Sequence, residues 1–346
     1  YWKNTIIPTI QSGKAKAVLD EKYAYPDRVG LCPGISCNFF CYFCGRNYSA
    51  VYEKEWGEKG FEMYKQIIDQ TPKGVNKKKV YHITGGLEPL TFPHIGDLVS
   101  YGQKAGFEME IQTNGSYLTS GFIEKHPGIK DLSILRISLY GVDNDSTFEV
   151  TKNKKAYGVV KENLIDYLKL NTKTKLGLNY VILHKRTKDI LKLLDYIEEI
   201  NIKSNNQVDF LTLREDFAEE AENILGEERQ EIYNIFNEVQ KRLESKNLNK
   251  LHIDYGYALE SIRKNQNSYQ RGLEKVDYKQ LRPKAFPQIA VMVDPKGDVF
   301  AYHEATFLDR KGAKRYCIGT VDKEHSMKDV IKEFVENSNG ITDPLP

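Results

Sequence analysis

The sequence lacks several features that would assign it to a large class of proteins. Its 346 residues contain no apolar run of membrane-spanning length, and its first residues do not show the charged and apolar regions of a signal peptide. The 50 basic and 48 acidic residues nearly balance, so the chain has no strongly basic field for nucleic acid. We therefore expect a cytoplasmic protein without a membrane or nucleic acid as partner.

Cysteine is also scarce, with five residues in the whole chain. Cys37, Cys41 and Cys44 fall in one short stretch, which leaves only Cys32 and Cys317 elsewhere. An additional iron-sulfur cluster would need about three or four more thiolates, which the sequence does not contain. No second pair of Cys or His follows the stretch at the spacing of a zinc finger.

The spacing in Cys37-Asn-Phe-Phe-Cys41-Tyr-Phe-Cys44 suits an iron-sulfur cube with one iron left open. Most iron-sulfur sites use four cysteines, and structural zinc is closed by four ligands. Here three thiolates leave one metal position without a protein ligand. A partial zinc site, or a loop with three buried cysteines, is the alternative at this point.

The cysteine pattern, with Phe43 directly before the last cysteine, resembles the signature of the radical S-adenosylmethionine (SAM) superfamily. The resemblance implies a 4Fe-4S cluster held by Cys37, Cys41 and Cys44, with the amino and carboxylate groups of SAM at the open iron. It also implies an electron donor such as flavodoxin or ferredoxin. A reducing cytoplasm suits such a site, because exposed thiolates and clusters are lost to oxidation.

Strand and helix patterns alternate along the middle of the chain, which predicts an α/β fold. Six strand-helix units favour a parallel sheet with right-handed crossovers, short of the eight units of a closed barrel. The family resemblance implies a partial (β/α)6 barrel similar to a TIM barrel. The predicted strands cover 29–34, 80–84, 107–113, 133–138, 176–182 and 208–213.

The two ends of the chain differ from the middle. Residues 1–28 are mixed and polar and are expected to form an N-terminal extension, followed by the barrel over 29–249. A C-terminal extension that covers the substrate is expected over 250–346. It contains a hairpin signal at Pro295-Lys-Gly297 and a capping pattern that begins a helix at Ser326.

Polar residues follow several of these strands, where barrels place their chemistry. Gly85 and Gly86 would let the backbone approach the methionine part of SAM, and Glu88 would accept from its ammonium group. This segment is similar to the Gly-Gly-Glu motif of the family, with Leu87 interposed. The resemblance further assigns Phe43 to the cluster or the adenine, and Thr113, Asn114, Ser138 and Asn179 to the remaining parts of SAM. Ordinary turn and strand-end residues are the alternative for each.

Several segments resemble a narrower group, the radical SAM enzymes of unusual-sugar and nucleoside biosynthesis in natural-product pathways. Members of this group deaminate a TDP-linked amino sugar or decarboxylate cytosylglucuronate. The resemblance therefore implies a lyase acting on a small-molecule sugar substrate that is nucleotide-linked or part of a nucleoside. The segments that carry it are 28–34, 84–90, 136–141, 211–216 and 303–310.

The expected substrate needs polar groups around a sugar and positive charge near a diphosphate or carboxylate. Arg214 and Glu215 would supply both, since arginine offers a bidentate fork to either anion. Tyr302, His303 and Glu304 would close the pocket. Surface ion pairs and hairpin-end residues are the alternative for these five positions.

Two other functions stay open on the sequence. The first is a radical SAM enzyme that modifies a peptide, which the absence of auxiliary cysteines weakens. The second is a non-catalytic protein that binds a metal through the same cysteines. The second leaves the segments around Gly85 and Ser138 unexplained.

Overall fold

The computed structural model describes residues 7–44, 51–73, 80–183, 186–215, 229–265, 285–302, 306 and 312–337. They form a ten-stranded sheet in the order β10-β9-β8-β1-β2-β3-β4-β5-β6-β7. Neighbours from β8 and β1 through to β7 are parallel, whereas β9 is antiparallel to both β8 and β10. The strands are β1 (Arg28–Leu31), β2 (Val80–Ile83), β3 (Glu108–Thr113), β4 (Ile134–Leu139), β5 (Lys175–Ile182), β6 (Phe210–Glu215), β7 (His252–Asp254), β8 (Ala290–Val293), β9 (Asp298–Phe300) and β10 (Cys317–Thr320).

Helices connect most of the parallel strands, and among the described residues none is long and apolar enough to cross a membrane. The α-helices are α1 (Ile7–Gln11), α2 (Lys14–Leu19), α3 (Glu55–Gln70), α4 (Ile95–Lys104), α5 (Ser120–Lys125), α6 (Asn144–Thr151), α7 (Ala156–Lys169), α8 (Asp189–Ser204), α10 (Arg229–Arg242), α11 (Gly256–Arg263) and α13 (Met327–Asn337). Short 3-10 turns cover Pro89–Thr91, Pro127–Asp131 and Ala313–Tyr316.

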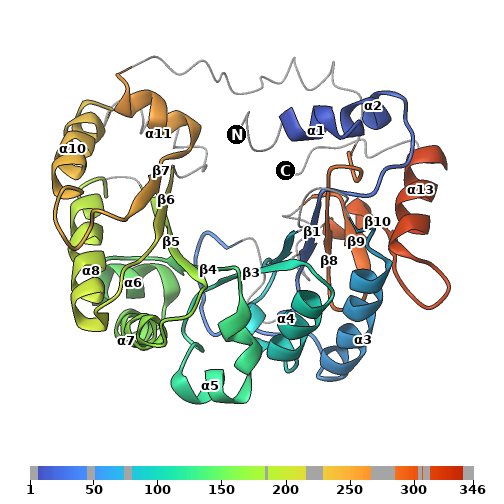
Figure 1. Cartoon of the computed structure of the whole chain (residues 1–346), viewed down its shortest axis with the longest axis horizontal. Helices are drawn as coiled ribbons and strands as arrows, with labels where there is room; N and C mark the ends of the chain where they lie inside the picture. Colours follow the sequence, from blue (N-terminus) through green and yellow to red (C-terminus); the bar gives the residue numbers. More distant parts are fainter. Residues whose placement is uncertain are drawn as a thin grey trace.

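The sheet is curved like an arch, and α3, α4, α5, α7 and α8 lie on its convex side (Figure 1). Alternation along the strands explains this arrangement, because every second side chain is apolar and packs beneath the helices. Leu31, Ile83, Ile111, Ile137 and Leu178 are all fully buried on that side. The intervening side chains are largely polar and half-buried, and they line the concave face.

The structure confirms the predicted α/β fold with its partial barrel. Each of the six predicted strands has its counterpart among β1 to β6, and the hairpin is formed by β8 and β9. Gly297 in its turn has φ +89°, a conformation that favours glycine. The capping pair is also confirmed, since the Ser326 amide donates to the Asp329 carboxylate at 3.0 Å and the Asp329 amide donates to the Ser326 hydroxyl at 3.2 Å.

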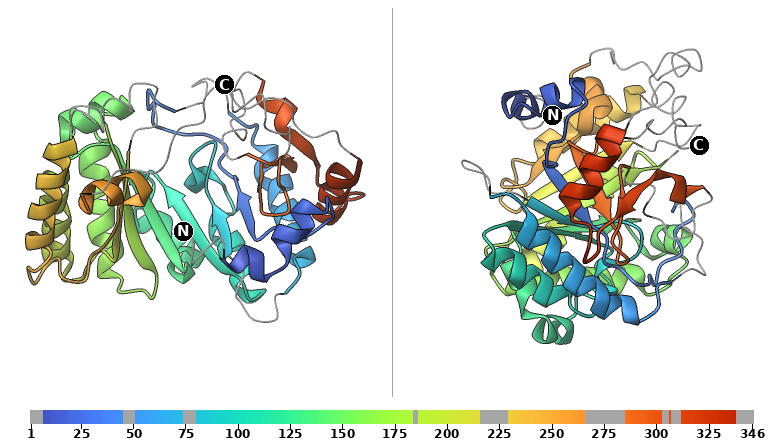
Figure 2. Two further views of the ribbon diagram at one scale, coloured as in Figure 1. Left: turned by 90° about the horizontal axis from the view of Figure 1, so that it is seen from above. Right: turned by 90° about the vertical axis from the view of Figure 1, so that its right-hand side faces the viewer.

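The chain after residue 250 is divided between the two edges of the sheet, as the left view of Figure 2 also shows. β7 extends the sheet beyond β6, whereas β8, β9 and β10 lie beyond β1. In the β1–β8 pair, Leu31 is in register with Val293, and the Cys32 amide donates to the Val293 carbonyl at 2.8 Å. The C-terminal hairpin therefore lies next to the start of the cysteine loop.

Candidate active site

The three cysteines lie on the loop that follows β1, and neighbouring segments hold this loop by hydrogen bonds. The amides of Ile35 and Ser36 donate to Thr91 Oγ1 at 3.0 and 3.2 Å. On another side, the amide of Phe40 donates to the carbonyl of Thr151, the last residue of α6, at 2.9 Å. The loop is thus fixed by the segments that follow β2 and β4.

Asn114 connects the end of β3 to the same loop. Its Nδ2 donates to Asn38 Oδ1 at 3.1 Å and lies 3.8 Å from Cys37 Sγ. Its Oδ1 accepts from the amide and the hydroxyl of Ser116 at 2.9 and 2.7 Å. Asn114, expected at the cofactor, thus meets the cysteine loop directly, and Asn38 is a neighbour that the sequence analysis did not single out.

Tyr140 lies close to all three cysteines, directly after β4. Its ring centroid is 5.8 Å from that of Phe39 and 6.0 Å from that of Phe43. Burial, followed by the charges of the three cysteines and Glu88, raises the pKa of Tyr140 well above its usual range. Sequence analysis noted the segment 136–141 but missed this residue. The aromatic residues within the cysteine motif could have indicated Tyr140, because their rings need an apolar or aromatic partner to pack against.

Cys37, Cys41 and Cys44 fit the ligand set of a 4Fe-4S cluster with an open corner. Cys41 is buried in the core, and Cys37 and Cys44 are half-buried and pack against it. In the described part of the chain, no three His, Cys, Asp or Glu side chains lie close enough to hold a single metal ion. A cluster is larger than a single ion, so its thiolates need not converge as closely.

Glu88 is almost completely buried, with 3% of its surface exposed. Its Oε1 accepts from the Leu90 amide at 3.0 Å and from the Thr113 hydroxyl, and its Oε2 accepts from the Asn114 amide at 2.8 Å. Burial raises the pKa of Glu88, although these donors oppose that effect. The carboxylate therefore joins the segment after β2 to the end of β3, and its contact with SAM stays a prediction.

Gly85 and Gly86 have φ values of +78° and +45°, which side chains rarely adopt. A Cβ at Gly85 would lie 2.7 Å from Cys32 Sγ, and one at Gly86 would lie 2.9 Å from the Thr306 carbonyl oxygen. Glycine is thus required at both positions by the backbone conformation and by the close neighbours. The contact of this turn with SAM stays a prediction.

Ser138 and Asn179 lie side by side on the concave face, in one row with Thr212 and Asp254. The Ser138 hydroxyl accepts from Gln112 Nε2 at 3.3 Å. Asn179 Oδ1 is buried and has no hydrogen-bond partner among the described residues. Because an unsatisfied buried acceptor costs about 1–3 kcal/mol, a donor on a bound ligand would stabilise this residue.

Two arginines bring positive charge to the same face. Arg214 Nη2 donates to Asp254 Oδ2 at 2.8 Å, and its Nη1 donates to the Asp254 carbonyl at 3.3 Å. The Arg136 guanidinium lies 4.6 Å from the centre of the Phe210 ring. Gly177 makes this stack possible, since a Cβ there would lie 2.0 Å from the Phe210 ring. The lowered pKa of Arg136 is due to burial.

The remaining predicted substrate residues are only partly described. Tyr302 is half-buried beyond β9, with its ring edge-on to Tyr316 at 5.6 Å. His303 and Glu304 lie outside the described residues, as does the side chain of Glu215, the last residue of β6. Their predicted roles therefore stay predictions.

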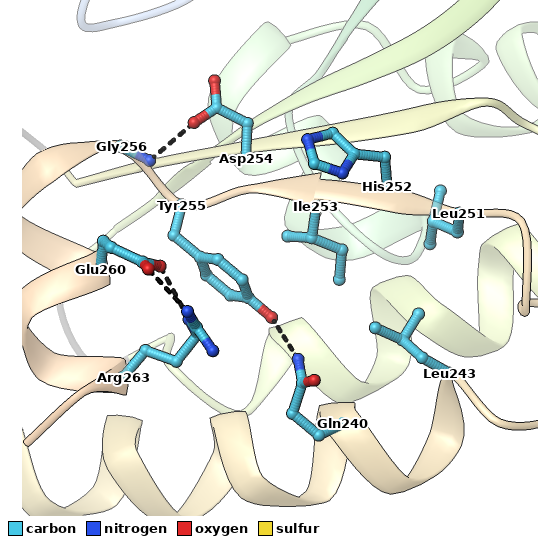
Figure 3. Close-up of a pocket in the computed structure, with 10 residues that line it drawn as sticks. All are labelled: Gln240, Leu243, Leu251, His252, Ile253, Asp254, Tyr255, Gly256, Glu260 and Arg263. Atoms are coloured by element: carbon cyan, nitrogen blue, oxygen red, sulfur yellow. Dashed lines mark hydrogen bonds and ion pairs between the residues drawn. The ribbon is translucent and has the colours of Figure 1, made fainter. Parts of the chain in front are cut away.

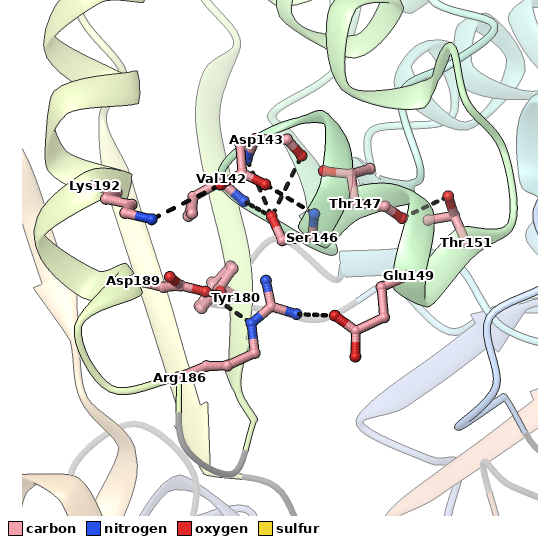
Figure 4. Close-up of polar contacts among 10 residues, drawn as sticks. All are labelled: Val142, Asp143, Ser146, Thr147, Glu149, Thr151, Tyr180, Arg186, Asp189 and Lys192. Carbon is pink, nitrogen blue, oxygen red and sulfur yellow. Dashed lines mark hydrogen bonds and ion pairs between the residues drawn. The ribbon is translucent and has the colours of Figure 1, made fainter.

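A polar network at the end of β5 supports α6, whose last residue holds the cysteine loop (Figure 4). Asp189 accepts from Arg186 Nε at 2.8 Å and from the Tyr180 hydroxyl at 3.2 Å. Asp143 caps α6 by accepting from the Ser146 amide at 2.8 Å. Sequence analysis did not single out this network, although Asp143 and Ser146 have the spacing of a helix cap.

A pocket of about 460 Å³ lies between β7, α10 and α11, and Asp254 from the concave-face row is among its lining residues (Figure 3). Within it, Gln240 donates to the Tyr255 hydroxyl at 3.3 Å, and Glu260 pairs with Arg263 at 2.6 Å. It contains none of the predicted site residues. The candidate active site is instead the open concave face next to the cysteine loop.

Comparison with known proteins agrees with this geometry. The family model described as the radical SAM superfamily matches residues 31–197. Over 347 aligned residues, the chain is 37% identical to the dTDP-4-amino-4,6-dideoxy-D-glucose ammonia-lyase of Streptomyces venezuelae, covering 99% of this chain and 70% of that protein. The chain belongs to the radical SAM superfamily. The predicted cofactors of this radical SAM enzyme, a 4Fe-4S cluster and SAM, are thereby confirmed.

Solved structures of other proteins share the fold. Streptococcus suis SuiB bound to its precursor peptide SuiA has a TM-score of 0.60 at 14% identity, covering 97% of this chain and 71% of SuiB. The enzyme anSMEcpe with bound AdoMet has a TM-score of 0.58 at 16% identity, covering 91% of this chain and 78% of that one. At these identities the likeness concerns the fold alone.

Proposed function

We propose that this radical SAM enzyme removes ammonia from an amino sugar linked to a nucleoside diphosphate. The 37% identity to the ammonia-lyase over 99% of this chain carries the proposal. The family model ends at residue 197, whereas this similarity continues through β6, β7 and the C-terminal hairpin. A likeness that extends beyond the cofactor-binding half supports a related substrate as well as a shared cofactor.

The charges on the concave face suit such a substrate. Arg214 offers a planar fork to a diphosphate, and Arg136 adds a second positive charge on the same face. Asp254, which is half-exposed, can accept from the ammonium group of an amino sugar. When bound, the cluster and SAM supply abstraction of a hydrogen atom from a substrate carbon by a 5′-deoxyadenosyl radical. The residues of the chain would bind and orient the sugar and exclude water.

We extend the proposal to the predicted residues. Cys37, Cys41 and Cys44 would hold the cluster, and a flavodoxin or ferredoxin would supply the electron. The SAM contacts would come from Phe43, Gly85, Gly86, Glu88, Thr113, Asn114, Ser138 and Asn179. The substrate would meet Arg214, Glu215, Tyr302, His303 and Glu304.

The test is anaerobic reconstitution with iron and sulfide, followed by incubation with SAM and dithionite. 5′-Deoxyadenosine and ammonia would be measured with three substrates: a dTDP-linked 4-amino sugar, the same sugar with a hydroxyl in place of the amine, and a uronic nucleoside. We expect ammonia to accompany deoxyadenosine only with the amino sugar. Carbon dioxide from the uronic nucleoside would favour decarboxylation instead. No sugar-dependent deoxyadenosine would overturn the proposal.

A further inference from the structure

His82 and Glu110 form a pair on the concave face that none of the roles described above uses. His82 Nδ1 lies 3.0 Å from Glu110 Oε2, and the two residues are direct partners in the β2–β3 register. The Glu110 side chain is 11% exposed and that of His82 is 35% exposed. A mostly buried carboxylate thus holds an imidazole that a substrate can still reach.

The surroundings of the pair favour one orientation of the ring. The carboxylate faces Nδ1, so the tautomer with its proton on Nδ1 is stabilised and Nε2 is left as a proton acceptor. The nearby guanidinium of Arg136 on β4 balances the charge of Glu110, which in turn stabilises the arginine cation. Arg214 and Asp254 are the next charged groups around Arg136.

On the other side of His82, the sheet provides an apolar neighbour. Its register partner on β1 is Gly30, which has no side chain. A Cβ at Gly30 would lie 2.2 Å from Met292 Sδ, so the methionine of β8 occupies the position above the glycine. His82 therefore lies between an apolar residue and a single carboxylate, an environment suited to proton transfer rather than to a surface ion pair.

We propose that His82, oriented by Glu110, accepts a proton from the substrate during the loss of ammonia, an inference that rests on the proposed function. The step begins after a hydrogen atom has left the carbinol carbon beside the carbon that bears the protonated amine. The hydroxyl O–H bond breaks, and its proton passes to His82 Nε2. An oxygen electron pair then forms the carbonyl bond, while the C–N pair leaves with ammonia.

This step balances without a further reactant. The unpaired electron moves from the carbinol carbon to the carbon that carried the amine. The C–N electron pair neutralises the nitrogen, so ammonia leaves uncharged, and the one positive charge now resides on the imidazolium beside Glu110. His82 is the catalytic residue in this proposal, and Glu110 is a positioning residue.

The first test compares His82→Gln with His94→Gln. His94 is a matched control, because it is also a histidine paired with a glutamate: its Nε2 lies 2.8 Å from Glu58 Oε2. This pair belongs to α3 and the start of α4, on the side of the sheet that the helices cover. The ratio of ammonia to deoxyadenosine would be measured with the dTDP-linked amino sugar. We expect this ratio to fall about 100-fold in His82→Gln, the usual scale of general-base catalysis, with sugar affinity kept within about twofold. The ratio should be unchanged in His94→Gln.

The second test does not require turnover. Nitrogen-15 spectra of labelled histidine side chains would be recorded on the protein without cofactor, and His82 would be assigned by the signal lost in His82→Gln. We expect His82 to hold one tautomer in the wild type and a mixture in Glu110→Gln.

The outcomes separate this inference from the proposed function. An unchanged ratio in His82→Gln, or a loss of sugar affinity without a change in the ratio, would overturn the role of His82. If the wild-type enzyme forms no sugar-dependent deoxyadenosine, the proposed function fails. The spectra then decide alone whether Glu110 orients His82, and a tautomer mixture in the wild-type protein would refute that orientation.

Discussion

Around the cysteine loop the polar side chains are bonded to one another, whereas on the concave face they keep unused hydrogen-bonding capacity. Glu88 accepts from three donors of the protein, and Asn114 uses both its amide nitrogen and its oxygen. On the concave face, the two charged side chains proposed to meet the substrate are open to solvent. The Arg214 and Asp254 side chains are 39% and 51% exposed.

This difference teaches how one barrel serves a constant cofactor and a specific substrate. Side chains around the cysteine loop are held by hydrogen bonds to neighbouring residues. They therefore keep the geometry that a cofactor needs without reorganisation. Groups that bind a substrate must exchange water or a weak partner for the ligand, so strong internal bonds would oppose binding. The predictions below test whether the two regions differ in this way.

The largest effect is expected at the cluster. Cys41→Ala should abolish cluster assembly and SAM cleavage, because two thiolates hold a cube poorly. Iron content and deoxyadenosine formation after anaerobic reconstitution would measure this. Cys317→Ala is the matched control and should keep its iron, since this cysteine lies on β10 away from the motif. Wild-type SAM cleavage in Cys41→Ala would contradict the cluster assignment.

The next effect concerns the rigidity of the cofactor end. Glu88→Ala should lower the free energy of unfolding by about 3 kcal/mol, because it leaves buried donors without an acceptor. Urea denaturation of the apo protein would measure the change. Glu62→Ala removes an exposed carboxylate that pairs with Lys65 on α3, and it should change stability by less than about 0.5 kcal/mol. Equal effects would remove the proposed contrast between buried and exposed carboxylates.

A pH-dependent effect is expected at Asp294, in the hairpin beside the cysteine loop. Its carboxylate accepts from the Tyr52 hydroxyl at 2.9 Å and from the Lys296 and Asp298 amides at 2.8 and 3.0 Å. Burial nevertheless raises the pKa of Asp294 to about 6. The folded state therefore binds the proton more tightly than the unfolded state, and the stability gained at low pH is lost as the pH rises through about 6.

Asp294→Asn should remove this dependence. Relative to the wild type, the variant should gain on the order of 2 kcal/mol in free energy of unfolding between about pH 4 and pH 7. Denaturation curves across that range would measure the difference. Asp166→Asn, which alters an exposed carboxylate on α7, should run parallel to the wild type. A wild-type curve that parallels Asp294→Asn at every pH would refute the raised pKa.

The smallest effect is expected at Arg214 on the concave face. Arg214→Ala should weaken affinity for the sugar nucleotide about tenfold, the scale of one charged hydrogen bond. Deoxyadenosine formed without substrate should stay nearly unchanged. Isothermal titration calorimetry would measure the affinity. Arg263→Ala is the control, because Arg263 pairs with Glu260 within α11 and is not one of the proposed substrate residues. Unchanged affinity would remove Arg214 from the site.

Local patterns in the sequence determined the fold class and the cofactor. Strand alternation and helical spacing depend on neighbouring residues, so the strands from β1 to β6 could be predicted, whereas the partial barrel was implied by the family resemblance. Thiolate spacing in 37–44 is equally local, and it indicated the superfamily correctly. The turn at Gly85 and Gly86 could be recognised for the same reason, because glycine is needed where φ is positive.

Only the tertiary structure decided which distant residues meet. The pairing of β8 with β1 brings Asp294 beside the cysteine loop, and the β2–β3 register places His82 against Glu110. Tyr140 and the three cysteines are likewise brought together only by the tertiary structure. These contacts depend on strand register and sheet curvature, which arise from packing between segments far apart in the chain. A sequence pattern carries no information on such pairings until the sheet that creates them is known.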